Sequence, residues 1–331
     1  MNRLTRLWRT VSVASAVVSM LLVPGASAQE PGKPWPARPL RIVVGFAAGG
    51  VADTTARVVA AKLADQLGQP VVVENRPSAG GIVAADTVAK AEADGTTLLL
   101  LSNGNAVSAT LFRSLPYDTL TDFAPVSLLG TFDVAVVARS DAPIASIADL
   151  VAAARARPGR LNVGTINVGS TQHLSAELFK SMAAIDATIV PYKGSPAVIT
   201  ALRAGDVEVA FEMLAPVLPQ AAGGAIRILA VGGERRAPAL PDVPTVAEAG
   251  VAGYVASSWN AIAVPARTPP AIVERLAREI ARAIAAPDVR ERLAAAGVTP
   301  RSSTPGELRR LLAADIDKWR AVIECAGIER Q

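Results

Sequence analysis

The sequence predicts an α/β protein built of two lobes, each with a mostly parallel sheet flanked by helices. Short, continuously apolar runs alternate with Ala-rich helical patterns, which is typical of parallel strands covered on both faces. Two longer apolar stretches, 123–138 and 254–265, lie where the chain would pass between two lobes. The last third, 269–328, has a helical pattern without a further strand.

The individual elements follow from these patterns in order along the chain. Helix starts are marked by a hydroxyl residue with an acid three positions later, at Ser146, Thr245 and Thr304. The apolar runs predict strands at 40–44, 71–73, 97–101, 161–163, 188–190, 207–211 and 226–231. The Ala-rich segments between them predict helices at 53–67, 82–91, 147–156, 171–183 and 196–204.

We interpret the two long apolar stretches as crossing strands at a hinge. The first lobe then combines residues 29–130 with 256–331, and the second lobe is the inserted segment 131–255. Two successive domains with a single crossing are the alternative, which fits the lone C-terminal helical block less well. In open α/β sheets, ligands bind at the carboxyl ends of the strands, where turns present helix N-termini. The candidate site is therefore formed by five turns, at 45–51, 101–105, 164–171, 191–195 and 211–214.

The N-terminus has the features of a secretion signal. Three arginines precede an apolar run at 11–23, and Ala26-Ser27-Ala28 is a small-residue cleavage site. The apolar run has 13 residues, fewer than the roughly 20 needed to cross a bilayer. An uncleaved anchor is the alternative. We predict a mature periplasmic protein that begins at Gln29 and has a short Pro-rich leader before its first strand.

Composition excludes several classes of function. The whole chain has a net charge of +4, but residues 1–28 contain three Arg and no acid, which leaves 30 basic and 29 acidic side chains. That balance gives no reason to expect a nucleic-acid partner. With one Cys and one His, an internal disulfide and a His/Cys zinc site are both excluded. We expect a monomer without metal or cofactor that binds a small polar ligand.

The turn after the first predicted strand is a candidate anion site. A strand, a small-residue turn and a helix place the backbone N–H groups of Gly49, Gly50 and Val51 at a helix N-terminus, where the macrodipole favours an anion. Val51 and Ala52 stand where a nucleotide-binding P-loop needs Lys and Ser/Thr, so that interpretation fails. Two alternatives stay open: glycines needed only for backbone geometry, and Asp53 as a helix cap rather than a ligand contact.

A second turn of small residues leads into the helix predicted at 171–183. Either Ser170 or Thr171 is a plausible N-cap. The alternative is that hydroxyl and N–H groups here, with Gly169, hold an oxyanion opposite the first turn. His173 has no Cys partner, and the chain contains no G-x-S-x-G sequence, so a structural role is favoured over a catalytic one.

Other polar residues follow predicted strands. Lys193 is a cation near the proposed cleft, with a solvated loop lysine as its alternative, and an acid at Glu212 would be costly to bury without a partner. No catalytic residue is expected. The full set of candidate ligand-binding residues is Phe46, Gly49, Gly50, Val51, Asp53, Ser102, Asn103, Gly169, Ser170, Thr171, His173, Tyr192, Lys193 and Glu212.

Sequence blocks in register along the chain, from about Trp35 to the C-terminus, resemble the Bug family. This family comprises the TctC-like extracytoplasmic solute receptors of tripartite tricarboxylate transporters. The blocks are 39–50 with Asp53, 68–77 with Gly80 and Gly81, 115–118, 123–126, 169–171 with His173, 191–194 and 240–245.

The resemblance implies a two-lobed periplasmic binding protein, type II-like, that closes on a small carboxylate and delivers it to a membrane permease. Family members grip one carboxylate between the two glycine and hydroxyl turns, largely with backbone N–H groups and bridging waters. Two alternatives remain: a ligand-binding partner of a sensor kinase, and an enzyme on the same scaffold, for which a nucleophile is lacking.

The sequence departs from the family pattern at three places. The first turn reads Gly-Phe-Ala-Ala-Gly-Gly, where many relatives have Pro-Phe-Pro-Pro-Gly-Gly. Glu212-Met213 stands where the family commonly has an aspartate and a polar residue, which implies a different ligand. Cys325 in the last predicted helix is not a family feature.

Overall fold

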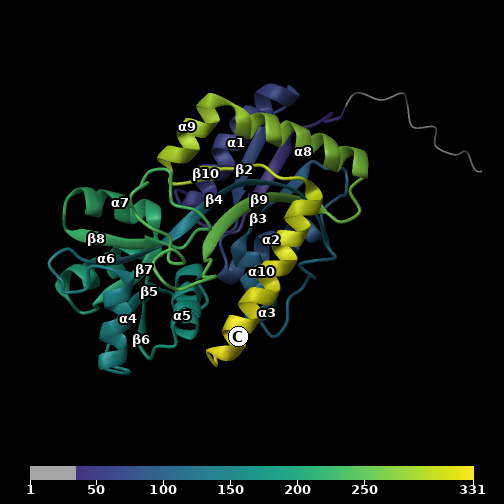
Figure 1. Ribbon diagram of the computed structural model, residues 1–331. Helices are drawn as coiled ribbons and strands as arrows, with labels where there is room; N and C mark the ends of the chain where they lie inside the picture. Colours follow the sequence, from purple (N-terminus) through teal and green to yellow (C-terminus); the bar gives the residue numbers. More distant parts are fainter. Residues whose placement is uncertain (1–34) are drawn as a thin grey trace, which may run out of the picture. The chain divides into compact units, whose positions relative to one another are not determined.

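One strand, β4 (Phe123–Arg139), organises the sheet, because it is 17 residues long and has different partners along its two halves. Its first half pairs with β9 (Ser257–Pro265), and its second half pairs with β7 (Val209–Met213) and β8 (Ile226–Val231). The computed structural model, which describes residues 35–331, therefore contains one continuous ten-stranded sheet (Figure 1). The predicted signal segment 1–28 lies outside the described residues.

The sheet is mixed, whereas the sequence predicted two mostly parallel sheets. Parallel pairs join β1 (Leu40–Val44) to β2 (Val71–Asn75) and β3 (Thr97–Ser102). They also join β5 (Asn162–Ile166) to β6 (Thr188–Tyr192) and β7. The long strands β4 and β9 are antiparallel to every strand with which they pair. They merge two parallel groups into one sheet of order β2-β1-β3-β9-β4-β7-β5-β6.

The strand directions make the two groups of βα turns face each other. Because β3 is antiparallel to β9, and β9 to β4, strands β1 and β3 run in the same direction as β4. β7 is antiparallel to β4, so β5, β6 and β7 run back toward the first group. The carboxyl ends of β1 and β3 thus point toward the carboxyl ends of β5, β6 and β7. Ligand sites of open α/β sheets form at such ends.

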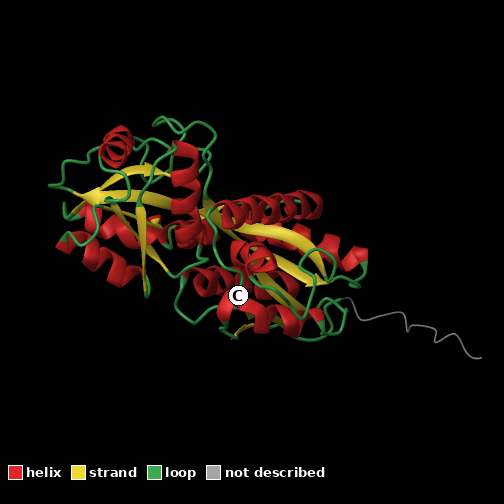
Figure 2. Cartoon of the chain, turned by 90° about the horizontal axis from the view of Figure 1, so that it is seen from below, coloured by secondary structure: helices red, strands yellow, loops and turns green. Residues whose placement is uncertain are grey.

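Helices cover both faces of the strands (Figure 2). They are α1 (Val51–Leu67), α2 (Ile82–Ala89) after the 3-10 turn η1 (Ala79–Gly81), α3 (Asn103–Leu111), α4 (Ile147–Ala156), α5 (Thr171–Ala183), α6 (Ser195–Ala204), α7 (Leu214–Ala222), α8 (Pro270–Ala285), α9 (Pro287–Ala295) and α10 (Pro305–Cys325). Near β1 to β3, α1 contacts α8 and α9, and α10 contacts both α3 and β4. Around β5 to β8, α5 and α6 pack on β5 and β7, and α7 packs on β8.

The structure differs from the predicted elements at several places, beyond shifts of a few residues in their bounds. Helix α3 was predicted only as a polar turn, because it starts with Asn-Gly-Asn, which are poor helix formers. Thr245 and Glu248 do form reciprocal capping bonds, of 2.8 and 3.1 Å, but in a turn that no helix follows. The short strand β10 (Thr299–Pro300) lies in the segment that was expected to be purely helical, and it pairs with β4.

Aromatic side chains fix the segment before β9 to α5. Phe179 on α5 packs against Phe211 and Tyr254, with ring centroids 5.5 and 6.0 Å apart. All three rings are buried, and the Tyr254 hydroxyl donates to the Ser175 carbonyl at 3.0 Å. This cluster holds α5 in one orientation on the sheet. Within residues 35–331, no helix is both long and apolar enough to span a membrane.

Candidate functional site

The first residues of α3 and α5 contact each other directly. Asn103 Nδ2 donates to Thr171 Oγ1 at 2.8 Å, although the two residues lie 68 positions apart in the chain. Asn103 is fully buried and Thr171 is 9% exposed. The contact follows from the facing strand ends, because α3 begins where β3 ends and α5 begins just after β5. Two helix N-termini from different strand groups therefore meet.

The contact between the N-termini of α3 and α5 concentrates positive electrostatic potential at this point. Each helix N-terminus carries roughly half an elementary charge and several N–H groups without an intrahelical acceptor. The first turns of α3 and α5 contain no acidic residue that would neutralise it. Two like ends held together favour an anion beside them, which is the chemistry expected of a carboxylate site.

The turn before α5 is shaped by Gly169 and Ser170. Ser170 is the N-cap, since its Oγ accepts from the His173 N–H at 3.1 Å. The N-cap interpretation of Ser170 is thus confirmed. Gly169 has φ +79°, and a Cβ placed there would lie 2.4 Å from Leu111 Cδ2 on α3. Glycine is needed here for the backbone conformation and also for the close approach to α3.

His173 lies in the first turn of α5 but is 6% exposed. Its Nδ1 has no hydrogen-bond partner among the described residues. Burial lowers the pKa of His173, and Glu177 opposes this only in part. The ring is therefore neutral at pH 7, with neither the charge nor the exposure needed to bind a carboxylate directly in this conformation.

The turn before α1 is held from inside by Asp53. Its carboxylate accepts from the Gly49 N–H at 2.9 Å, from Arg57 Nε at 3.0 Å and from Asn75 Nδ2 at 2.9 Å. These bonds, that of Arg57 foremost, lower the pKa of Asp53 to about 2. The helix-cap interpretation of Asp53 fits this geometry better than a ligand contact, because its partners are all internal.

The N-cap of α1 is Gly50, which has φ −80°. A Cβ at Gly50 would have only the Ala47 carbonyl oxygen nearby, at 3.8 Å. Val51, the first helical residue, is half-buried. The backbone in front of α1 is therefore open to a ligand, although the Gly49 N–H is already taken by Asp53.

Phe46 and Ser102 bring the first turn close to α3. The Phe46 side chain is 41% exposed, and a Cβ at Gly104 would lie 3.6 Å from Phe46 Cζ. The Ser102 N–H donates to Asn105 Oδ1 at 2.9 Å, which caps α3. Ser102 itself is buried. An apolar ring thus lies beside the N-terminus of α3.

Glu212 is fully buried at the end of β7. Its Oε1 accepts from Gln172 Nε2 at 2.9 Å and from the Met213 N–H at 2.7 Å. Among the described residues, Oε2 has no partner that meets hydrogen-bond geometry, although the Ser195 hydroxyl is near enough to favour the ionised form. Burial outweighs these bonds and raises the pKa of Glu212. Because the carboxyl group is fully buried and bonded to Gln172, it is not exposed to a ligand in this conformation.

Tyr192 and Lys193 lie at the turn before α6. Tyr192 is half-buried and Lys193 is exposed. Among the described residues, no side-chain hydrogen bond joins either of them to the other predicted site residues. The structure thus connects Phe46 with α3, α3 with α5, and α5 with Glu212, while Tyr192 and Lys193 belong to a separate turn.

Sequence reasoning missed three residues that organise this region. Trp319 on α10 donates from Nε1 to Asn103 Oδ1 at 2.7 Å. Gln172 holds Glu212, and Asn75 joins Asp53 to the Phe46 carbonyl. Asn75 lies in a block that carried the family resemblance, and Gln172 follows the predicted N-cap, so the sequence could have indicated both residues. No sequence feature indicated Trp319, because its contact depends on how α10 packs.

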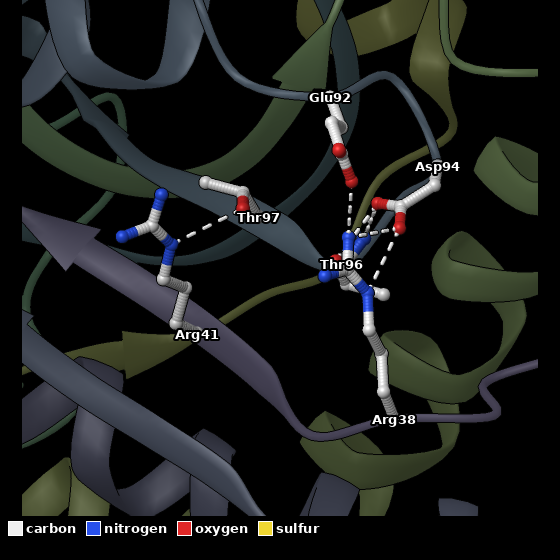
Figure 3. Close-up of polar contacts among 6 residues, drawn as sticks. All are labelled: Arg38, Arg41, Glu92, Asp94, Thr96 and Thr97. Atoms are coloured by element: carbon white, nitrogen blue, oxygen red, sulfur yellow. Dashed lines mark hydrogen bonds and ion pairs between the residues drawn. The ribbon is translucent and has the colours of Figure 1, made fainter.

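A second polar cluster lies at the opposite ends of β1 and β3 (Figure 3). Arg38 pairs with Glu92 and Asp94, and Arg41 Nε donates to Thr97 Oγ1 at 3.1 Å. A groove of about 480 Å³ is lined by residues of this cluster. Its arginines are paired with neighbouring acids, and it lies at the amino ends of the strands, whereas ligands of open α/β sheets bind at the carboxyl ends. We therefore do not assign the ligand site to it.

Both the sequence and the fold match known proteins. Residues 55–328 match the Tripartite tricarboxylate transporter family receptor. Protein BugT from Bordetella pertussis is 39% identical over 305 residues, covering 92% of this chain and 94% of BugT. A solved R. palustris protein with adipate is 38% identical, with a TM-score of 0.76, and covers 89% of this chain and 99% of that one.

Two further solved structures share the fold. MatC from Rhodopseudomonas palustris with bound malate is 34% identical, with a TM-score of 0.72, and the match covers 87% of this chain and 99% of MatC. The periplasmic binding protein BugD is 28% identical, with a TM-score of 0.74, and the match covers 90% of this chain and all of BugD. The α/β fold described above is therefore that of a periplasmic binding protein. The family match covers most of this chain, and several relatives align with it over most of their own length, so the chain belongs to the TctC family of tripartite tricarboxylate transporter receptors, which bind solutes and are not enzymes.

Proposed function

We propose that this receptor captures a small carboxylate between the facing turns before α1, α3 and α5. The observation that carries the proposal is the Asn103–Thr171 contact, which brings two acid-free helix N-termini together. An anion there gains charge-assisted hydrogen bonds from backbone N–H groups. Relatives solved with adipate and malate point to dicarboxylates as the first ligands to test.

The capture involves closure of two lobes, 29–130 with 256–331, and 131–255. The hinge lies where β4 leaves β9 and joins β7, near Asp133. Two backbone bonds support this location: the Gly232 N–H donates to the Val134 carbonyl at 2.7 Å, and the Ala256 N–H donates to the Gly232 carbonyl at 2.8 Å. In hinge closure, a few residues absorb the change in backbone angles while the lobes move as rigid bodies.

We further propose that the mature protein starts at Gln29, is exported to the periplasm and delivers its ligand, as a monomer, to the membrane permease of a tripartite tricarboxylate transporter. N-terminal sequencing of the periplasmic fraction tests the export. Loss of uptake of the bound carboxylate in a strain that lacks this gene tests the delivery; intact uptake there would favour a role beside a sensor kinase.

Two substitutions test how the ligand is held. Gly50→Leu adds a bulky side chain in front of α1 at a position whose φ and surroundings tolerate it. We expect it to abolish binding of adipate and malate while leaving the thermal unfolding temperature unchanged. Lys193→Ala is the matched test of a conventional ion pair.

The readout is a thermal-shift screen of mono-, di- and tricarboxylates, followed by calorimetric titration. A ligand at 100 times its Kd stabilises the folded state by about 2.7 kcal/mol. If Lys193→Ala removes binding and Gly50→Leu barely changes it, the backbone cradle is wrong. Scattering curves that stay superimposable with and without saturating ligand would contradict lobe closure.

A further inference from the structure

The hydrogen-bond direction at the centre of the site is fixed by a residue on α10. The indole Nε1–H of Trp319 is a donor only, and it lies 2.7 Å from Asn103 Oδ1. This bond requires the Asn103 oxygen to face Trp319. The amide nitrogen must then face Thr171, which it does at 2.8 Å. The orientation of a fully buried amide is thereby set by its chemistry.

This orientation has a consequence for Thr171. A hydroxyl group has one hydrogen to donate and two lone pairs that accept. Because Asn103 Nδ2 can only donate, the Thr171 oxygen accepts, and its hydroxyl hydrogen must point elsewhere. No described residue accepts a hydrogen bond from it. Thr171 is the first residue of α5, so this hydrogen lies at the same helix N-terminus as the backbone donors.

We infer that Trp319 and Asn103 are positioning residues that turn the Thr171 hydroxyl into a dedicated donor for an oxygen of the bound carboxylate. The inference rests on the proposed function, because it concerns the same site. Neither Trp319 nor Asn103 touches the ligand in this assignment, since both are fully buried and both ends of the Asn103 amide are occupied. The arrangement selects an acceptor, such as a carboxylate oxygen, over a donor such as an ammonium group.

This chain of hydrogen bonds from Trp319 through Asn103 to Thr171, here called the relay, predicts that the effects of substituting Trp319 and Thr171 are coupled. Thr171→Val removes the hydroxyl with little change in shape, and should raise the Kd for the tightest-binding carboxylate of the panel about 10- to 100-fold. Thr171→Ser, which keeps the hydroxyl, should restore most of the affinity. Trp319→Phe leaves the Asn103 amide free to turn, and should raise the Kd roughly three- to tenfold.

The deciding measurement is a double-mutant cycle on the Kd. If the relay operates, Trp319→Phe changes the Kd by less than about twofold in the Thr171→Val protein, because no hydroxyl remains to be oriented. If Trp319 only supports the packing of α10, the Trp319→Phe substitution weakens binding by the same factor in the parent and in the Thr171→Val protein, and the relay is refuted.

Asn103→Asp provides a second cycle should Trp319→Phe fail to fold. The new carboxylate accepts hydrogen bonds from both Trp319 and Thr171. The Thr171 hydroxyl then donates to this carboxylate and is no longer available to the ligand. The Asn103→Asp substitution should therefore weaken binding at least tenfold more in the parent than in the Thr171→Val protein, in which only the negative charge of the new carboxylate affects the ligand. Equal losses would refute the relay. A parent protein that binds no carboxylate would refute the proposed function and this inference with it, whereas additive losses in a protein that binds refute the relay alone.

Discussion

The buried carboxylate of Asp53 predicts how stability depends on pH. Hydrogen bonds from Arg57, Gly49 and Asn75 lower the pKa of Asp53 from 3.8 to about 2, against the opposing effect of burial. At 1.36 kcal/mol per pKa unit, this difference corresponds to roughly 2.4 kcal/mol of folding free energy near pH 7. We expect Asp53→Asn, which keeps the shape and removes the charge, to lose about that amount.

The pH range follows from the sign of the pKa change. Because the pKa is lower in the folded state, the stabilisation is fully present well above pH 4 and is lost as the pH falls toward 2. The difference in unfolding free energy between the parent and Asp53→Asn should therefore shrink across this range. Urea denaturation of both proteins at a series of pH values from 7 to 2.5 measures it.

Asp317→Asn is the matched control. Asp317 also pairs with an arginine of its own helix, Arg320, but 73% of its side chain is exposed. Solvent screens such a pair, so its loss should have little effect at any pH. An Asp53→Asn deficit that stays constant from pH 7 to 2.5, or one no larger than that of Asp317→Asn, would show that the internal bonds of Asp53 do not stabilise the fold as argued.

Three further predictions follow from the site. Ser170→Ala removes the N-cap of α5 and should cost about 1 kcal/mol of stability together with a modest loss of affinity; thermal unfolding and titration check both, and unchanged values would contradict the cap. Glu212→Gln removes a carboxyl group whose pKa is raised by burial, so the parent loses stability as the pH rises and this group ionises. The stability of the Glu212→Gln protein relative to the parent should therefore improve from pH 4 to pH 8 in denaturation curves; a pH-independent difference would refute this. Ser181→Cys places a thiol beside Cys325, because Ser181 Oγ on α5 and Cys325 Sγ on α10 lie 3.8 Å apart. Mild oxidation should then link the two proposed lobes and abolish ligand-induced compaction in scattering, and a reductant should restore it. Compaction of the oxidised protein would count against the hinge.

The local elements were predictable because each has a local cause. Runs that are apolar except for one arginine each, Leu40–Val44 and Ile226–Val231, match strands β1 and β8 residue for residue. The capping pairs that begin at Ser146 and Thr304 start helices α4 and α10 as expected. Backbone hydrogen bonding and capping are decided within a few residues, so one sequence carries enough information to place them.

The merged sheet and the inner contacts of the site were not predictable in the same way. Whether β4 separates two sheets or joins them depends on its antiparallel partners β7 and β9, which lie about 70 or more residues away along the chain. The sequence placed Asn103 among the ligand contacts, yet its amide is used by Trp319 and Thr171, from residues 216 and 68 positions away. Polar residues at strand ends thus indicated which turns come together, but not which of their side chains face inward; the ligand site itself stays a prediction.

The internal carboxylates also narrow the position of the ligand. Asp53 accepts the Gly49 N–H beside the N-terminus of α1, and Glu212 accepts the Met213 N–H at the N-cap of α7, so the protein supplies its own acids to these two helix ends. α3 and α5 have hydroxyl and amide caps and no acid in their first turns. Protein carboxylates therefore neutralise the N-termini of α3 and α5, where these meet, less than those of α1 and α7. We expect the first carboxylate of a ligand to bind there, with Gly50 and Phe46 facing its remainder. If so, Thr171→Val should weaken the binding of mono- and dicarboxylates alike, whereas Gly50→Leu should abolish the binding of dicarboxylates such as adipate and malate and spare short monocarboxylates; the reverse pattern would place the first carboxylate at α1.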